Sequence, residues 1–169
     1  MMLPLGRTAR PPRWLLAASV AAILLAAGCG GSPASPAGSA HSSRTVAILV
    51  KSLPQVGTVL VSKQGYALYM FVPDGRHAVT CTSSCALTWP PVMLPAGAAL
   101  TAGPGVRSSL LGSDPDPAGG RVVTYAGWPL YTYTGDVQPG RATGQGIDLN
   151  GGDWYVMRPS GAPLSSGPS

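Results

Sequence analysis

The chain has 169 residues and a formal net charge of +5, from 11 basic and 6 acidic residues. Three basic residues lie in the first 13 positions, and the remaining eight form no dense Lys/Arg cluster, which excludes the basic footprint of a nucleic-acid-binding protein. Abundant glycine and proline, with many Val, Thr and Tyr residues, favour strands and turns over helices. The Ala-, Gly-, Pro- and Arg-rich composition is typical of an actinobacterium with a GC-rich genome.

Residues 1–28 have the features of a bacterial export signal. Arg7, Arg10 and Arg13 form a positive segment, and the stretch 14–27 (WLLAASVAAILLAA) is uncharged and apolar. As a helix, this stretch is about 20 Å long, which is short of a hydrocarbon core of about 30 Å. The pattern therefore predicts a cleaved signal peptide and a location outside the cytoplasm.

The end of this signal resembles the lipobox of bacterial lipoproteins. Residues 25–29 read LAAGC, in which small residues precede Cys29; the departure is Ala26, where leucine is more usual. We predict that Cys29 carries a lipid (palmitate) and anchors the protein to the cell membrane on its extracytoplasmic side. The alternative is an ordinary secretory signal with an unmodified cysteine. Acylation of Cys29 leaves Cys81 and Cys85 as an even pair in an oxidising compartment.

Two low-complexity segments frame the rest of the chain. Residues 29–43 form a Gly/Ser/Pro/Ala-rich stretch that predicts a disordered tether, and residues 160–169 predict a disordered tail. The segment 44–159 between them is long enough for one domain. It opens with a continuous apolar run, 45–50 (TVAILV), which predicts a strand buried on both faces.

Two hairpins are predicted within this domain. Strands at 58–62 and 66–71 flank Lys63-Gln64-Gly65, and strands at 121–125 and 128–133 flank Ala126-Gly127. The other expected elements are a mostly irregular segment over 94–120, a long loop over 139–151 and a last strand over 154–158.

The two hairpins are copies of each other. Residues 65–74 align with 127–136 at an offset of 62, and 60–62 match 122–124 at the same offset. This self-similarity predicts an internal duplication, with repeat 1 at about 57–92 and repeat 2 at about 119–158. The expected fold is all-β: two homologous antiparallel hairpin repeats that form a small sandwich or barrel.

Both copies carry the pattern Tyr-x-aromatic-x-x-Asp, as YMFVPD at 69–74 and YTYTGD at 131–136. With the Trp-Pro-Pro segment at 89–91, these motifs resemble the predicted lipoproteins with a Yx(FWY)xxD motif, also called the secreted repeat of unknown function. The resemblance spans about 57–161. It implies an exported or lipid-anchored domain and no established activity.

Strand alternation separates the motif side chains into two sets. The motif aromatics share one strand face and the preceding leucines take the other: Tyr69, Phe71, Tyr131 and Tyr133 against Leu68 and Leu130. We expect the aromatic side chains to pack between the two repeats. The alternative is an exposed aromatic platform for a glycan or another flat ligand.

Asp74 and Asp136 end the two motifs. An aspartate in this position usually accepts hydrogen bonds from following backbone N–H groups and fixes a turn. The alternatives are an acid–base pair, which needs a carboxyl spacing of roughly 5–10 Å, or calcium ligands, although the chain has no Asp-dense loop.

Cys81 and Cys85 are expected to form a disulfide that restrains the segment between Phe71 and Trp89. The alternative is a copper site. Thiolate, imidazole and thioether groups suit Cu(I), and its ligands would be His77, Cys81, Cys85, Met70 and Met93. No other cofactor is expected.

Enzyme signatures are weak in this sequence. No Gly-x-Ser-x-Gly elbow is present, and the only histidines are His41, in the predicted tether, and His77. We therefore expect a non-catalytic binding or structural module of the cell envelope, with an unidentified envelope protein or ligand as partner. The alternatives are copper or redox handling and, third, an enzyme that acts on the cell wall.

Overall fold

The computed structural model describes residues 44–165. The chain divides into two units, Met1–Ser39 and Ala40–Ser169, and only the second contains described residues. The predicted signal peptide, the acylated Cys29 and the tether at 29–43 lie outside the described residues, as do positions 166–169. Among residues 44–165, no helix has the length and apolar character needed to cross a membrane.

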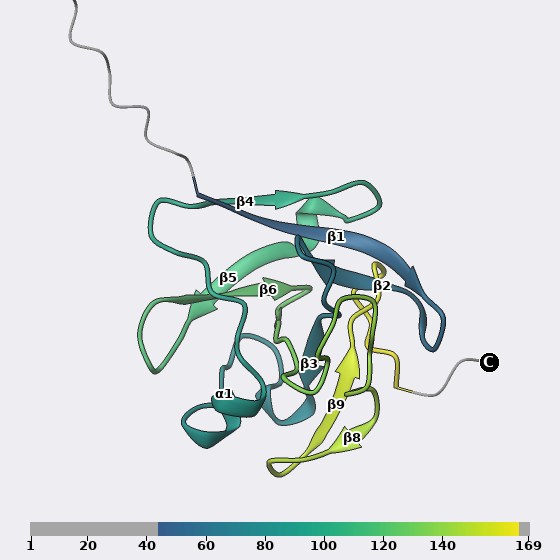
Figure 1. The fold of residues 1–169 in the computed structure, drawn as a ribbon. Coiled ribbons are helices and arrows are strands. Elements are labelled where there is room, and N and C mark those ends of the chain that lie inside the picture. The colour runs from purple at the N-terminus through teal and green to yellow at the C-terminus, as the bar shows by residue number, and fades with distance from the viewer. Residues whose placement is uncertain (1–43, 166–169) are drawn as a thin grey trace, which may run out of the picture. The chain divides into compact units, whose positions relative to one another are not determined.

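The described part of the chain is built almost entirely from short strands, as predicted (Figure 1). The strands are β1 (Thr45–Leu53), β2 (Gly57–Ser62), β3 (Tyr69–Phe71), β4 (Ala99–Ala102), β5 (Leu111–Pro115), β6 (Arg121–Tyr125), β7 (Trp128–Pro129), β8 (Ile147–Asp148) and β9 (Asp153–Val156). They form three sheets with the orders β2-β1-β4, β3-β9-β8 and β5-β6-β7. The helical elements are α1 (Ser84–Thr88) and the 3-10 turns Val72–Asp74 and Ser108–Leu110. The all-β prediction is confirmed.

Strand β1 has one antiparallel and one parallel neighbour. It is antiparallel to β2 and parallel to β4, which lies at the top of Figure 1. The predicted strand is therefore present, but the prediction that both of its faces are buried is wrong. Only Ile48 and Leu53 are buried, because each face of β1 meets the margin of a different hydrophobic cluster and the remaining side chains are half-buried or exposed.

The second hairpin has the predicted two-residue turn. Ala126 and Gly127 have φ angles of 52° and 83°, and positive φ at both positions is what the tight turn between two antiparallel strands requires. In the first hairpin, the Ser62 N–H donates to the Tyr66 carbonyl, and this hydrogen bond closes a three-residue turn, Lys63–Gly65. One extra residue therefore separates the strands of the first hairpin.

That extra residue corrects the alignment of the repeats. Leu68 N–H donates to Leu60 O at 3.0 Å, and Leu130 N–H donates to Val123 O at 2.9 Å. Leu60 is thus the structural equivalent of Val123, at an offset of 63 rather than the predicted 62 upstream of the turn. The same offset relates β1 to β5, since each is the antiparallel neighbour of its repeat's first hairpin strand.

The segment 94–120 is more regular than predicted. It contains β4, which pairs with β1, and β5, which pairs with β6. Sequence pattern missed both strands because they are short and rich in Gly, Ala, Pro and Asp, and because the partner of β4 is the distant strand β1. The loop expected over 139–151 likewise contains β8, and the last strand begins at Asp153 and ends at Val156.

The prediction of a disordered tail is wrong for residues 160–164. Leu164 is 1% exposed and packs in a hydrophobic cluster. Its N–H donates to Val156 O at 2.9 Å, and Arg158 N–H donates to Ala162 O at 3.0 Å. The segment is held because β8 pairs only with Asp153 and Trp154 of β9, which leaves the Val156 carbonyl free to accept from Leu164.

Two hydrophobic clusters fill the domain, and they sort the motif side chains as predicted. The first holds the motif aromatics with Trp89 and Trp154, and the second holds Leu68 and Leu130. Packing of the aromatic side chains in the core is therefore confirmed. The alternative prediction of an exposed aromatic platform is wrong for three motif aromatics, because they are buried: Tyr69, Phe71 and Tyr131.

Candidate functional site

The two motifs exchange their tyrosines. The Tyr69 hydroxyl of repeat 1 donates to Asp136 Oδ2 of repeat 2 at 2.7 Å, and the Tyr131 hydroxyl of repeat 2 donates to Asp74 Oδ2 of repeat 1 at 2.5 Å. The backbones of Tyr69 and Tyr131 also exchange two hydrogen bonds of 2.9 Å. Each motif is thus completed by the other repeat, and we call this arrangement the Tyr–Asp exchange.

The second oxygen of each aspartate fixes the loop that follows it. Asp74 Oδ1 accepts from Thr80 N and Oγ1 at 2.7 and 2.6 Å. Asp136 Oδ1 accepts from Thr143 N and Oγ1, both at 2.7 Å. The predicted turn-fixing role is confirmed, but the donors lie six and seven residues later and include a threonine hydroxyl. The sequence signal for them was a threonine six or seven residues after each motif aspartate.

Both carboxyl groups are buried, at 2% exposure for Asp74 and 3% for Asp136. Burying a carboxyl group is costly unless hydrogen bonds replace its water, and three donors face each aspartate. A carboxylate only accepts hydrogen bonds, so this all-donor environment suits it. The structure does not join the two carboxyls in one open cleft, because each is enclosed by one tyrosine and one threonine.

The tyrosine hydroxyls are held in their neutral, donating form. Burial raises the pKa of Tyr69 and of Tyr131 far above the usual value, and the hydrogen bond to the aspartate raises it further. A hydrogen bond from Gly144 N to the Tyr69 hydroxyl, at 3.2 Å, acts in the opposite direction on the pKa of Tyr69. Neither hydroxyl is suited to proton transfer near neutral pH.

A stack of four rings lies beside the Tyr–Asp exchange. Its order is Tyr133, Trp89, Trp154 and Phe71, with successive centroid separations of 4.1, 3.9 and 4.2 Å. The two central indoles are nearly parallel, at 2°. Tyr69 meets Trp89 edge-on at 5.3 Å and Tyr131 meets Trp154 edge-on at 5.2 Å. Each repeat therefore supplies one indole, one terminal ring and one edge-on tyrosine, and such contacts add to the burial energy.

The glycine-rich loop approaches this stack closely. A Cβ on Gly144 would lie 2.6 Å from Trp89 Cη2, so a larger residue cannot occupy that position without displacing the indole. Trp89 Nε1 is buried and has no hydrogen-bond partner among the described residues. The predicted loop over 139–151 thus closes the core beside Trp89, a role that no sequence pattern indicated.

The predicted disulfide joins Cys81 to Cys85. The segment between Phe71 and Trp89 is not only a loop, because α1 begins at Ser84 and ends at Thr88. The Trp89 N–H donates to Cys85 O at 2.8 Å, and both cysteines are buried in the first cluster. The disulfide and this short helix together deliver Trp89 to the ring stack.

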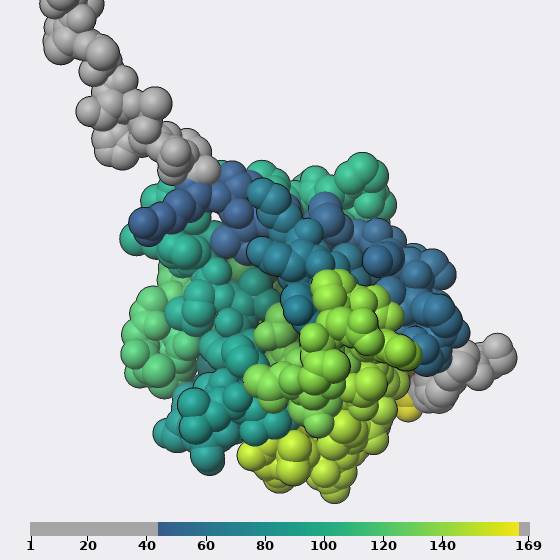
Figure 2. Space-filling model, in the orientation of Figure 1, coloured from purple at the N-terminus to yellow at the C-terminus, as the bar shows by residue number. Residues whose placement is uncertain are grey.

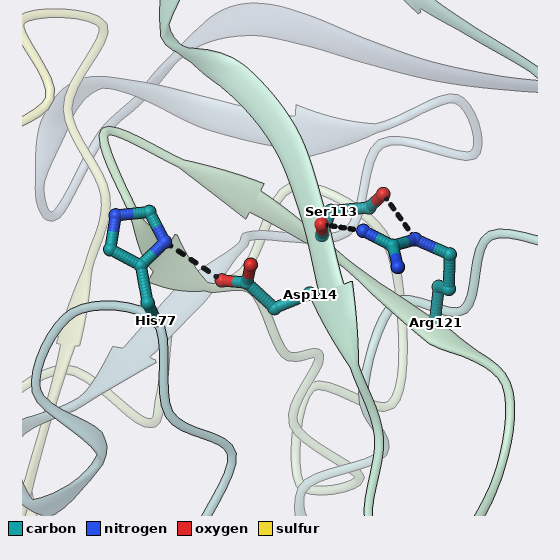
Figure 3. A network of polar contacts seen from close by, with 4 residues as sticks. All are labelled: His77, Ser113, Asp114 and Arg121. Carbon is teal, nitrogen blue, oxygen red and sulfur yellow. Dashed lines mark hydrogen bonds and ion pairs between the residues drawn. The ribbon is translucent and has the colours of Figure 1, made fainter.

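The structure does not bring together the ligands of the alternative copper site. The two sulfurs are bonded to each other, and Met70 is buried in the second cluster. His77 lies on the surface, where Figure 3 shows its ring facing Asp114, with Nδ1 3.2 Å from Oδ2. Met93 is 39% exposed. Residues 44–165 contain no group of three or more His, Cys, Asp or Glu side chains placed to hold a metal ion.

The loops after the two aspartates cross to the opposite repeat. His77 N–H donates to Gly127 O at 2.8 Å, and Gly140 N–H donates to Gly65 O at 3.1 Å. Each loop therefore rests on the hairpin turn of the other copy. We call these two contacts the interlocks, and they make His77 the structural equivalent of Gly140.

A family model described as a secreted repeat of unknown function matches residues 53–93 and 114–158. The chain belongs to this family of secreted repeats. The two matched segments contain both halves of the Tyr–Asp exchange, so in this secreted repeat protein the Yx(FWY)xxD motif is the element that joins one copy to the other. Membership of a secreted family supports an extracytoplasmic location. No curated protein and no solved structure matches the chain.

Proposed function

We propose that this protein is a lipid-anchored, non-catalytic binding module on the extracytoplasmic side of the cell membrane. The observation that supports this proposal is the Tyr–Asp exchange. In this exchange, the first tyrosine hydroxyl and the aspartate carboxyl of each motif make hydrogen bonds inside the domain. The groups that a hydrolytic enzyme would use are the ones that hold the repeats together, so the surface loops are what the domain offers to a partner.

The rigidity of the domain fits a binding role. Two buried carboxyls, a four-ring stack and a disulfide fix the same region from both repeats. Loops on a rigid scaffold bind with little ordering cost. The interlocks extend this rigidity to the two surface loops that follow Asp74 and Asp136.

The anchor is proposed from the lipobox-like residues 25–29. Its test is metabolic labelling with a fatty-acid analogue in cells that express the full chain or Cys29→Ala. We expect label and membrane association for the full chain, and an unlabelled Cys29→Ala protein in the soluble extracytoplasmic fraction. Wild-type protein that takes up no label would remove the anchor from the proposal.

The binding role is tested with the unanchored chain that starts at Ala40 and with washed cell envelopes. We expect saturable association, and we expect Tyr69→Phe to bind equally well at temperatures where it is folded, because Tyr69 acts inside the core. Non-saturable association would contradict a binding module. Loss of binding by folded Tyr69→Phe would instead place the motif at the ligand.

A further inference from the structure

The two interlocks are structurally equivalent but differ in charge. Lys51 of β1 is paired with Val59, and Asp114 of β5 is paired with Val122, so Lys51 and Asp114 occupy the same place in the two repeats. Asp114 contacts His77, and Lys51 lies beside Gly140, the equivalent of His77: a Cβ on Gly140 would be 3.9 Å from Lys51 Nζ. One repeat thus carries an acid at the position where the other carries a base.

The interlock on the second hairpin includes an acidic residue. Figure 3 shows the Asp114 carboxyl next to the His77 ring and the Arg121 guanidinium next to Ser113. Arg121 Nε donates to Ser113 Oγ at 2.8 Å, and its terminal nitrogen donates to the Ser113 carbonyl. This interlock therefore combines the Asp114 carboxyl with the exposed cations Arg76 and Arg121, so it is not uniformly basic.

The elements of the interlock on the first hairpin carry three cations. Lys51 on β1, Lys63 on the turn and Arg141 on the crossing loop are all exposed. Within residues 44–165 the His77–Asp114 contact is the one ion pair, so none of these three cations has an acidic partner. Figure 2 shows the yellow-green atoms of the loop after Asp136 against the blue atoms of β1 and β2, which places these elements on one face.

An apolar side chain lies on the same loop. Val137 is 82% exposed, and it directly follows the buried Asp136. We call Lys51, Lys63, Val137 and Arg141 the basic loop patch. The fold does not require its charges, because the interlock itself is a backbone hydrogen bond between Gly140 and Gly65.

Basic side chains around an exposed apolar residue match the interface of an anionic bilayer, where cations meet headgroup phosphates and the apolar group enters the acyl boundary. The four aspartates outside the core lie on other elements: Asp114 on β5, Asp116 just after it, Asp148 on β8 and Asp153 on β9. None of these aspartates pairs with a patch cation, so no ion pair has to break before the patch meets an anionic surface.

The length of chain before the domain keeps this patch close to a membrane. Only residues 30–43 separate Cys29 from Arg44, and a chain of that length reaches at most about 54 Å. An anchor at Cys29 therefore holds the domain near the bilayer and favours a second contact through high effective concentration. This step rests on the anchor in the proposed function.

We infer that the basic loop patch docks the domain onto the anionic phospholipid headgroups of the membrane that holds its anchor. The docked face is the one formed by the first hairpin turn, β1 and the loop after Asp136. The opposite interlock, with His77 and Asp114, stays away from the headgroups.

The test uses the unanchored chain from Ala40, which contains both hydrophobic clusters and the disulfide. Its binding is measured by sedimentation with vesicles of phosphatidylcholine alone and of phosphatidylcholine with one-third phosphatidylglycerol. We expect binding to the anionic vesicles only, weakened by added salt. Arg141→Ser, which removes one patch cation, should lower the partition coefficient about fivefold, and the charge reversal Lys51→Asp should lower it about 30-fold.

The variants are Lys51→Asp, which gives the first interlock the charge of its twin, Arg141→Ser, and Val137→Ser. The matched control is Arg76→Ser, which removes an exposed cation from the loop of the other interlock. Thermal melts establish that each variant is folded at the temperature of the assay. We expect weaker binding for the three patch variants and unchanged binding for Arg76→Ser.

Three results would overturn the inference. The first is equal binding to neutral and anionic vesicles, or none to either. The second is an equal loss in Arg76→Ser, which would assign the effect to net charge. The third is binding of soluble polyphosphate that is as tight as binding to the vesicles and is unchanged by Val137→Ser. This result would identify a phosphate polymer as the ligand of the patch. None of these results alters acylation of Cys29 or envelope binding, so the proposed function is tested separately.

Discussion

The Tyr69 hydroxyl and the Asp136 carboxyl meet at 2.7 Å although 67 positions separate them in the chain. The mirror pair, Tyr131 and Asp74, is 57 positions apart and meets at 2.5 Å. A motif of six residues is therefore not a local unit. Its tyrosine and its aspartate each require the other copy, so one repeat alone would leave the tyrosine hydroxyl and one carboxyl oxygen without these partners.

Tyr69→Phe should destabilise the domain by about 1–3 kcal/mol, because it removes a donor from a buried carboxyl and leaves the ring in place. Urea unfolding monitored by tryptophan fluorescence measures the change. The matched control is Tyr133→Phe, since among the described residues the Tyr133 hydroxyl makes no hydrogen bond. A loss in Tyr133→Phe as large as that in Tyr69→Phe would contradict the Tyr–Asp exchange as the source of stability.

Stability should fall steeply above pH 10. The pKa of Tyr69 and of Tyr131 is raised in the folded state, whereas an unfolded tyrosine ionises near pH 10. The unfolded state then binds fewer protons, so stability is full below pH 10 and is lost as pH rises above it. The expected slope is about 1.4 kcal/mol per pH unit for each tyrosine. Urea unfolding between pH 9 and 11 tests this, and the Tyr69→Phe/Tyr131→Phe double variant should lose most of the dependence.

Leu68→Ala and Leu130→Ala should each destabilise the domain by about 2–5 kcal/mol, because both side chains are fully buried in the second cluster. Differential scanning calorimetry would show both melting temperatures lowered. Leu87→Ala is the control: Leu87 is 79% exposed, and its loss should change stability by less than about 0.5 kcal/mol. An unchanged melting temperature in either core variant would contradict the model of a duplicated core.

Reduction of the Cys81–Cys85 disulfide should cost about 2 kcal/mol, because the closed loop is short. The effect should reach the ring stack, since Cys85 accepts the hydrogen bond from Trp89 N–H. Near-UV circular dichroism reports on the stacked indoles Trp89 and Trp154. We expect a weaker signal on reduction at temperatures where the domain is still folded, and an unchanged spectrum would show that α1 holds Trp89 without the disulfide.

Features that depend on neighbouring residues could be predicted from the sequence. Alternation along 68–71 and 130–133 separated the leucines of one cluster from the aromatics of the other, because successive side chains of an extended chain point to opposite faces, and this holds although β7 itself ends at Pro129. The duplication was visible because both copies keep the same residue types at the same spacing. Cysteine spacing and count indicated the disulfide that joins Cys81 to Cys85.

Which groups meet across the repeats depends on how the whole chain folds. The chain order suggests that each aspartate serves its own repeat, but the closure of the domain joins Tyr69 to Asp136 and sends the loop after Asp136 onto the turn at Gly65. The same closure ordered Leu164 and supplied β1 as the partner of β4. These contacts carry no local pattern, because hydrogen bonds and burial between distant segments depend on where the backbone returns and not on the residues that flank each group.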